Sequence, residues 1–190
     1  MAENRRRLCA EIGTEPELLN YGRQVHGPLV RRADGQGEHG DGVWSDAPGE
    51  PLLVFTADCL PVALARANGE RPAIAALHIG WRGLLTGIVQ AGAAALGGGR
   101  LAAAIGPGIG PCCYEVGEEV ASPFRERFGA GVVTGGRLDL WSATEQALRA
   151  AGAQDVTRVD LCTACNPDLF FSHRRDTGRT GRQGLIAYVS

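Results

Sequence analysis

Short apolar runs, each bounded by glycine or by a polar turn, constrain the fold of this chain more than any other feature of its sequence. Such runs are shorter than a buried helix requires and are typical of strands that are covered on both faces. We predict five strands on this basis, at Leu52–Thr56, Ala73–Ile79, Leu101–Ile105, 156–161 and 184–189.

Three longer segments predict helices, at 83–96, 115–128 and 140–151. The first carries leucine, isoleucine and valine along one face at helical spacing. Pro123 is expected to break the second. Asp139, or a capping box of Ser142 and Glu145, begins the third, and Gly152 ends it. The glycine- and aspartate-rich segment 35–48 reads as a surface loop. Strands and helices alternate imperfectly, so we expect a mixed α+β fold and not a doubly wound sheet.

Composition and charge narrow the class of protein. A chain of 190 residues with 44% hydrophobic and 21% charged residues is expected to form a single domain spanning residues 1–190. The net charge of −2 favours neither nucleic acid nor a membrane as partner. Residues 1–12 are polar and do not resemble a signal peptide, so we expect a cytoplasmic protein. In that reducing compartment, its six cysteines point to metal binding, catalysis or burial and not to disulfides.

Two predicted strands end in residues that bind metals. Cys59 follows the run at Leu52–Thr56, His78 lies near the end of Ala73–Ile79, and His26 precedes a glycine. Imidazole and thiolate suit zinc, and three protein ligands with one open position is the catalytic arrangement. The wide spacing matches no compact zinc motif, so by itself it favours ordinary buried side chains. His39, in the predicted loop, is expected to be exposed.

Two further motifs have structural explanations. Cys162 and Cys165 form a lone CxxC pair, and the adjacent Cys112 and Cys113 are a poor second pair for one ion, so small packed residues are favoured over a zinc or redox site. The glycine-rich segment 106–111 lacks a nucleotide-binding pattern. It forms either a tight turn or a backbone anion site.

Near the C-terminus, arginines surround Ser172 and His173. Such a cluster binds phosphate or forms a solvated basic loop, and composition alone favours the loop. His173 is a candidate proton donor.

Together, several ordered segments of this sequence resemble one family. They are QVHG at 24–27, TADCLP at 56–61, LHIGWRG at 77–83, IGPGIGPCCYEVG at 105–117, and FSHRRD at 171–176 with TGR at 180–182. This pattern resembles the YfiH/YlmD family, long called multicopper polyphenol oxidases or laccases and now read as purine nucleoside phosphorylases. The resemblance implies a sandwich of mixed β-sheets flanked by helices, similar to the catalytic domain of cytotoxic necrotizing factors. It also implies one metal ion, zinc or alternatively copper, held by His26, Cys59 and His78.

The activity implied by this resemblance is phosphorolysis of adenosine, inosine and methylthioadenosine, together with adenosine deamination. Purine nucleosides and phosphate are then the partners. The implied catalytic residues are Asp58, Cys59, His78 and Arg82, where Asp58 orients a histidine or moves a proton. The implied residues for substrate and phosphate are Arg82, Glu115, Ser172, Arg174, Arg175 and Arg182. Family members carry a longer segment before the position of Asn4, with an arginine expected to face the pocket.

Three other functions compete with this prediction. A multicopper phenol oxidase needs more histidines than the four in this sequence. A cysteine hydrolase or amidase would use Cys59 as nucleophile and His78 as base. A binding protein without activity would hold metal but turn over no nucleoside.

Overall fold

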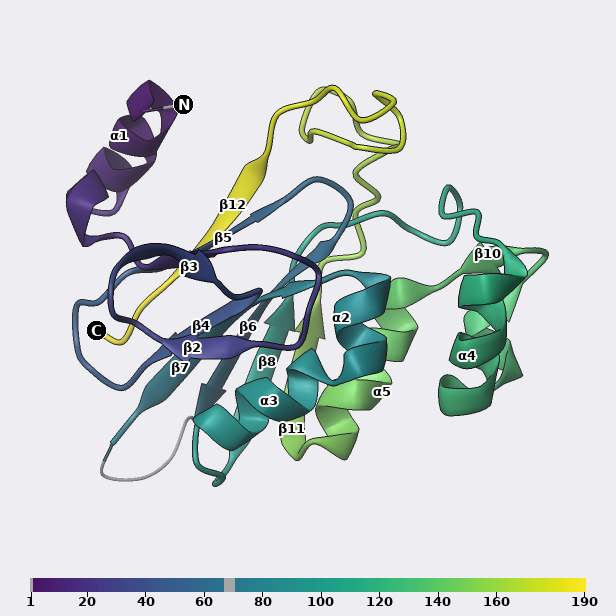
Figure 1. Cartoon of the computed structure of the whole chain (residues 1–190), viewed down its shortest axis with the longest axis horizontal. Helices are drawn as coiled ribbons and strands as arrows, with labels where there is room; N and C mark the ends of the chain where they lie inside the picture. The colour runs from purple at the N-terminus through teal and green to yellow at the C-terminus, as the bar shows by residue number, and fades with distance from the viewer. Residues whose placement is uncertain (1, 67–70) are drawn as a thin grey trace.

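A six-stranded mixed sheet forms the centre of the structure, a computed structural model that describes residues 2–66 and 71–190 (Figure 1). Its strands lie in the order β11 (Ala153–Arg158), β8 (Leu101–Ile105), β6 (Leu60–Arg66), β7 (Ala73–Ile79), β4 (Gly42–Ser45) and β2 (Val30–Arg32). The outer pairs β11–β8 and β2–β4 are parallel, whereas β6 runs antiparallel to both of its neighbours and β4 runs antiparallel to β7.

A two-stranded antiparallel ribbon covers one face of this sheet. It pairs β5 (Leu52–Thr56) with β12 (Gln183–Ala187), and a small core of Val43, Leu52, Val54 and Ala76 fills the space between ribbon and sheet. Helix α1 (Ala2–Glu11) packs on the ribbon through Cys9, which contacts a cluster with Leu19 and Leu53. The remaining short elements are β1 (Tyr21–Arg23) paired with β3 (Gln36–His39), β9 (Val133–Thr134) paired with β10 (Arg137–Leu138), and the 3-10 turns η1 (Pro16–Leu18) and η2 (Ala130–Val132).

Helices cover the other face. They are α2 (Trp81–Thr86), α3 (Ile88–Ala95), α4 (Glu118–Phe128) and α5 (Leu140–Ala150), with α4 set furthest from the sheet (Figure 1). The main core lies between these helices and the sheet, and it includes the fully buried Leu64, Leu77, Ile88, Phe124 and Leu148. Each such side chain stabilises the fold by about 1.5–3 kcal/mol relative to exposure. The predicted α+β sandwich of mixed sheets flanked by helices is confirmed.

The strand and helix predictions vary in accuracy. Three strands begin and end where predicted, whereas β11 begins three residues before the predicted segment 156–161. The predicted helix 83–96 is two helices, because Gly87 adopts a left-handed φ of 98° between them. Pro123 lies inside α4 and does not end it, since Val120, Ala121 and Phe124 bury that helix against the core. The side chain of Asp139 caps α5 by accepting the Ser142 amide at 2.9 Å.

The prediction of a surface loop at 35–48 is wrong. This segment contains β3, which is exposed and includes His39 as expected, and β4, which is largely buried inside the central sheet. Gly42 permits that position, because a Cβ atom there would come within 2.8 Å of both Leu77 and Val30. Only pairing with a distant strand gives this polar, glycine-rich sequence an extended conformation.

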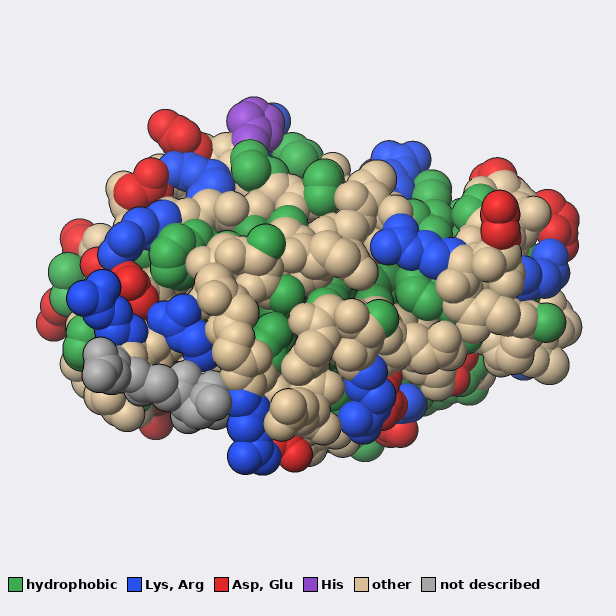
Figure 2. Space-filling view, turned by 90° about the horizontal axis from the view of Figure 1, so that it is seen from below, with side chains coloured by type: hydrophobic (Ala, Val, Ile, Leu, Met, Phe, Trp, Pro, Cys, Tyr) green, Lys and Arg blue, Asp and Glu red, His purple; other side chains and the backbone are tan. Residues whose placement is uncertain are grey.

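The surface carries charges of both signs. On the face seen in Figure 2, arginine and acidic side chains are interspersed toward the two ends of the molecule, and backbone and neutral side chains occupy most of the middle. Among the described residues, none of the helices has the length and apolar character needed to cross a bilayer.

Candidate active site

His26, Cys59 and His78, far apart in sequence, meet at one end of the central sheet. One ligand atom from each lies within 4.8 Å of the others, and the two imidazole rings meet edge to face with centroids 4.9 Å apart. Strand pairing explains the convergence, because Pro61 of β6 lies opposite His78 of β7. The turn that carries Cys59 therefore sits beside the end of β7.

Gly80 allows these ligands to approach one another. A Cβ atom at this position would lie 3.0 Å from the Cys59 sulfur and 3.1 Å from the Cδ2 atom of His26. Gly80 is also the N-cap residue of α2, so the chain turns away from the cluster directly after β7. The glycine of the motif LHIGWRG is therefore required because any larger side chain would collide with Cys59 and His26.

Asp41 organises both histidines and was not predicted. Its fully buried carboxylate accepts the amides of Val25, His26 and Gly27 at 2.8–2.9 Å and lies 2.7 Å from Nδ1 of His78. The amide bonds hold the loop of His26, where that residue has a positive φ of 62°. A carboxylate on the outer nitrogen of a metal-binding histidine directs the other nitrogen toward the metal. The sequence signal was an aspartate between two glycines, at positions 40 and 42.

The three groups shift one another's ionisation. Burial opposes ionisation of Cys59, but hydrogen bonds and positive charge from His26 and His78 outweigh it and lower the thiol pKa to about 7. Burial likewise opposes protonation of His78, and its bonds to Asp41 and Cys59 raise the imidazole pKa to about 9. In Asp41, burial is outweighed by the bonds from His78 and the loop amides, so the carboxyl pKa is lowered. The cluster therefore favours a thiolate, which is the form that binds metals.

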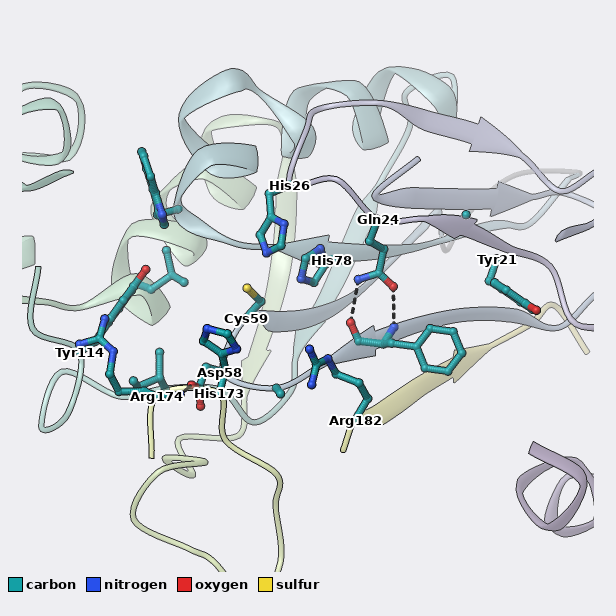
Figure 3. Close-up of a pocket in the computed structure, with 16 residues that line it drawn as sticks. Tyr21, Gln24, His26, Asp58, Cys59, His78, Tyr114, His173, Arg174 and Arg182 are labelled. Carbon is teal, nitrogen blue, oxygen red and sulfur yellow. Dashed lines mark hydrogen bonds between the residues drawn. The ribbon is translucent and has the colours of Figure 1, made fainter. Parts of the chain in front are cut away.

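A cavity of about 560 Å³ opens onto the cluster (Figure 3). Its size falls within the range of small-molecule sites. Gln24 fixes one wall, because its amide group exchanges two hydrogen bonds with the backbone of Phe55, at 2.7 and 2.8 Å. The lining is otherwise rich in aromatic and basic side chains: Tyr21, Phe55, Trp81, Tyr114, His173, Arg174 and Arg182.

Four of the predicted residues outside the metal cluster line this cavity: Asp58, His173, Arg174 and Arg182. Asp58 is buried with a φ of 89°, and its carboxylate accepts the Thr163 hydroxyl at 2.6 Å and the Arg174 amide at 2.7 Å. Asp58 therefore connects the loop of Thr163 to the loop of Arg174. The carboxylate that contacts a histidine is that of Asp41 and not, as expected, that of Asp58. Arg174 donates to the Glu115 carbonyl at 2.8 Å and stacks over Tyr114.

The other predicted pocket residues lie outside the lining of this cavity. Arg82 is exposed on α2, with its guanidinium over the Trp81 ring. The side chain of Glu115 is exposed and pairs with Arg137. Its backbone carbonyl accepts a hydrogen bond from Arg174, which lines the cavity. Both side chains are exposed, and their roles in binding substrate and phosphate stay predictions.

Ser172 and Arg175 serve the C-terminal loop. Ser172 is fully buried, and its hydroxyl accepts the Arg175 amide at 3.1 Å. The Arg175 guanidinium binds the carbonyls of Thr163 and Phe170, at 2.9 and 3.0 Å, and pairs with Asp176. Arg175 therefore holds the C-terminal loop through internal bonds, and its contact with phosphate stays a prediction.

The two remaining motifs lie together after the carboxyl end of β8, at the same end of the central sheet as the metal cluster. In the glycine-rich segment the amides of Gly106 and Ile109 donate to the carbonyls of Pro61 and Asp58, both at 2.8 Å, which favours the tight turn over the anion site. Contrary to the expectation from adjacent cysteines, this turn brings Cys112 and Cys113 next to the pair Cys162 and Cys165.

Comparison with known proteins identifies the group to which this architecture belongs. A family model described as Multi-copper polyphenol oxidoreductase laccase matches residues 1–190. The chain belongs to this family. Among its curated relatives, a purine nucleoside phosphorylase of Deinococcus radiodurans is 40% identical, with 98% of this chain and 76% of the relative covered. The purine nucleoside phosphorylase YfiH of Escherichia coli is 35% identical, covering 98% and 80%.

Solved structures of the YfiH/YlmD family share the fold. YlmD from Geobacillus stearothermophilus superposes with a TM-score of 0.89 at 29% identity, over all of this chain and 80% of that one. The Bacillus licheniformis protein YfiH gives a TM-score of 0.90 at 27% identity, with the same coverage. The predicted membership of the YfiH/YlmD family is confirmed.

The residues present fit a metal ion of the kind that the family's description names. Two imidazoles and a thiol form a donor set that suits zinc or copper. The buried Asp41 carboxylate supports one of these imidazoles, as is usual behind metal-binding histidines.

Proposed function

We propose that this chain is a zinc-dependent purine nucleoside phosphorylase, acting on adenosine, inosine and methylthioadenosine, that also deaminates adenosine. One observation carries the proposal: the His26, Cys59 and His78 cluster opens into a cavity of nucleoside size, in a family whose relatives are named purine nucleoside phosphorylases. The six free cysteines favour a reducing compartment, so we place the enzyme in the cytoplasm as one catalytic domain.

The cavity offers separate contacts for base and phosphate. Trp81 and Tyr114 present aromatic surface on which a purine can stack. Arg174 and Arg182 lie across the cavity from His26, and guanidinium groups bind phosphate oxygens through paired N–H donors (Figure 3). The bond from Arg174 to Glu115 occupies only one of its several donors and fixes its direction.

In phosphorolysis a phosphate oxygen bonds to C1′ of the ribose, and the C1′–N9 bond breaks with its electron pair leaving on the purine. The departing purine needs a proton, and His173 is the candidate donor because its ring faces the cavity. In deamination water replaces the amino group at C6 and ammonia leaves. Zinc, when bound, supplies Lewis acidity and activates water for this reaction.

The test is to incubate metal-analysed protein with adenosine, with and without phosphate. Adenine that forms only with phosphate establishes phosphorolysis, and inosine in both samples establishes deamination. His78→Ala should form neither product while retaining the wild-type circular dichroism spectrum. Neither product from zinc-loaded wild-type protein would refute the proposal.

A cysteine hydrolase is the second candidate. It is favoured by the lowered thiol pKa of Cys59, about 7, beside an imidazole. A thiolate bound to metal does not attack a carbonyl carbon, so the two candidates require different states of Cys59. Retention of hydrolytic activity after removal of all metal would support the hydrolase.

Copper in place of zinc is the remaining alternative for the ion, since the family's description refers to copper. Oxygen uptake with a phenol, measured with zinc-loaded and copper-loaded protein, separates phenol oxidation from nucleoside chemistry.

A further inference from the structure

Four cysteines outside the proposed active site meet where two parallel strands end. Cys112 and Cys113 follow β8, and Cys162 and Cys165 follow β11. Because β8 and β11 are parallel neighbours, their carboxyl ends lie at one edge of the sheet and the two following loops leave side by side. An isolated bridge between Gly108 and Cys162 continues the pairing into these loops, and the Thr163 amide donates to the Gly108 carbonyl at 3.0 Å.

The four sulfur atoms have the spacing of ligands around one ion. All lie within 4.8 Å of one another, and the Cys165 sulfur is 3.5 Å from that of Cys112 and 3.3 Å from that of Cys113. A disulfide requires about 2.05 Å between sulfurs. Tetrahedral zinc with Zn–S bonds of about 2.3 Å places its sulfurs about 3.8 Å apart. The two shortest distances, 3.3 and 3.5 Å, lie near the value for zinc and well above that for a disulfide.

The local backbone explains how adjacent cysteines contribute two ligands. The Gly110 carbonyl accepts the amides of Cys113 and Tyr114, both at 3.0 Å, so the chain turns tightly at this point. Gly110 is needed for close packing, because a Cβ atom there would lie 2.6 Å from the Trp141 ring. Its amide donates to the Cys162 sulfur at 3.2 Å, the kind of bond that supports a ligand from outside the coordination shell.

We propose that Cys112, Cys113, Cys162 and Cys165 bind one zinc ion as a closed, four-thiolate structural site, separate from the cluster of His26, Cys59 and His78. Four thiolates at tetrahedral spacing are the ligand set of structural zinc. The buried Cys162 anchors the site, while Cys112 and Cys165 are exposed and leave an entry path for the ion.

The ion would fasten two walls of the proposed active site. Tyr114, which lines the cavity, directly follows Cys113, and Thr163, which directly follows Cys162, donates to the Asp58 carboxylate. Arg175 in turn binds the Thr163 carbonyl and holds the C-terminal loop. The four-cysteine site therefore connects the base-stacking wall to the arginine-bearing loop.

Zinc content of the full chain tests the proposal without any assay of activity. Inductively coupled plasma mass spectrometry should find two zinc ions per wild-type chain and one in Cys162→Ala/Cys165→Ala. His26→Ala/His78→Ala should also retain one, and zinc K-edge absorption of that variant should show four sulfur ligands at about 2.3 Å. Cys9→Ala, which removes a cysteine from neither cluster, should retain both ions.

Variants of exposed ligands keep the test independent of folding. Cys112→Ala and Cys165→Ala remove side chains at the surface, and each should lose one zinc ion while keeping the wild-type circular dichroism spectrum. Cobalt added to metal-free protein should give thiolate-to-cobalt absorption that is stronger than in these variants, which keep only the thiolate of Cys59 at an intact site. Unchanged zinc content in both single variants, copper in place of zinc at the cysteines, or an intact-protein mass showing a disulfide among the four would overturn the proposal.

Discussion

The carboxylate of Asp41 lies 2.7 Å from Nδ1 of His78 and, with the same two oxygens, accepts the amides of three consecutive residues that include His26. This one buried side chain thus orients the imidazole ring of His78 and holds the backbone of His26 in place. Cys59 is the only ligand of the three that Asp41 does not position directly.

Asp41→Asn should weaken zinc binding by about 10- to 100-fold, since loss of a carboxylate behind a metal-binding histidine has effects of this size. Competition with a chromogenic chelator measures the change. Asp34→Asn, which alters an exposed aspartate paired with Arg31, is the matched control and should bind zinc as the wild type does. Equal affinity in Asp41→Asn would show that this carboxylate does not support the metal.

Gly80→Ala should also weaken the metal site. The added methyl group would meet the Cys59 sulfur at 3.0 Å and the His26 ring at 3.1 Å, and relief of such crowding costs about 1–3 kcal/mol. Zinc affinity should therefore fall by about tenfold or more. Gly131→Ala is the control, because a Cβ atom there has no heavy atom within 4 Å. If Gly80→Ala and Gly131→Ala bind zinc equally well, Cys59 and His26 can move aside for the added methyl group, and the close packing at Gly80 does not limit zinc binding.

Removal of the metal should expose Cys59 to alkylation. Iodoacetamide should leave Cys59 unmodified in zinc-loaded protein and modify it after chelation, because the metal holds the reactive thiolate. Cys59 is the only cysteine between Arg32 and Arg66, so the tryptic peptide 33–66 reports on it alone. Rapid alkylation with zinc fully bound would favour the cysteine hydrolase.

Arg174 and Arg175, adjacent in sequence, should respond differently to substitution. Arg174→Gln removes a charged contact proposed for phosphate, worth about 1.5–3 kcal/mol, so KM for phosphate should rise roughly 10- to 100-fold. Its one internal hydrogen bond, to the Glu115 carbonyl, makes the expected loss of Tm smaller than in Arg175→Gln. Arg175→Gln should mainly lower Tm, since its guanidinium binds two carbonyls and Asp176. Steady-state kinetics and thermal melts distinguish the two, and an unchanged KM in Arg174→Gln would exclude that residue from the phosphate site.

Glu145 should make stability depend on pH. Bonds from Arg158 and Arg149 lower the pKa of its carboxyl, so its contribution is present above the unfolded pKa of about 4.3 and is lost as pH falls through the folded value. Glu145→Gln should therefore lower Tm at pH 7, and the difference from wild type should shrink by about pH 3. Glu126→Gln, at an exposed glutamate on α4, should melt like the wild type at both pH values.

The sequence by itself determined the elements whose signals are local. The runs at Leu52–Thr56, Ala73–Ile79 and Leu101–Ile105 became strands with the predicted ends, because apolar runs of this length are too short for a buried helix and suit a buried strand. The motifs around His26, Cys59 and His78 identified the family and the candidate ligands, since their residue types and order are visible without a structure.

Tertiary structure alone decided which side chains meet. Asp41 stands in a segment that reads as a polar loop, and only the pairing of β4 with β7 buries it behind His78. Arg174 and Arg175 look alike in sequence, and the fold of the C-terminal loop directs one into the cavity and the other into internal bonds. The two cysteine pairs, about fifty residues apart, meet because β8 and β11 are parallel neighbours. Sequence patterns report periodicity and local turns, whereas contacts between distant residues depend on how the strands pair.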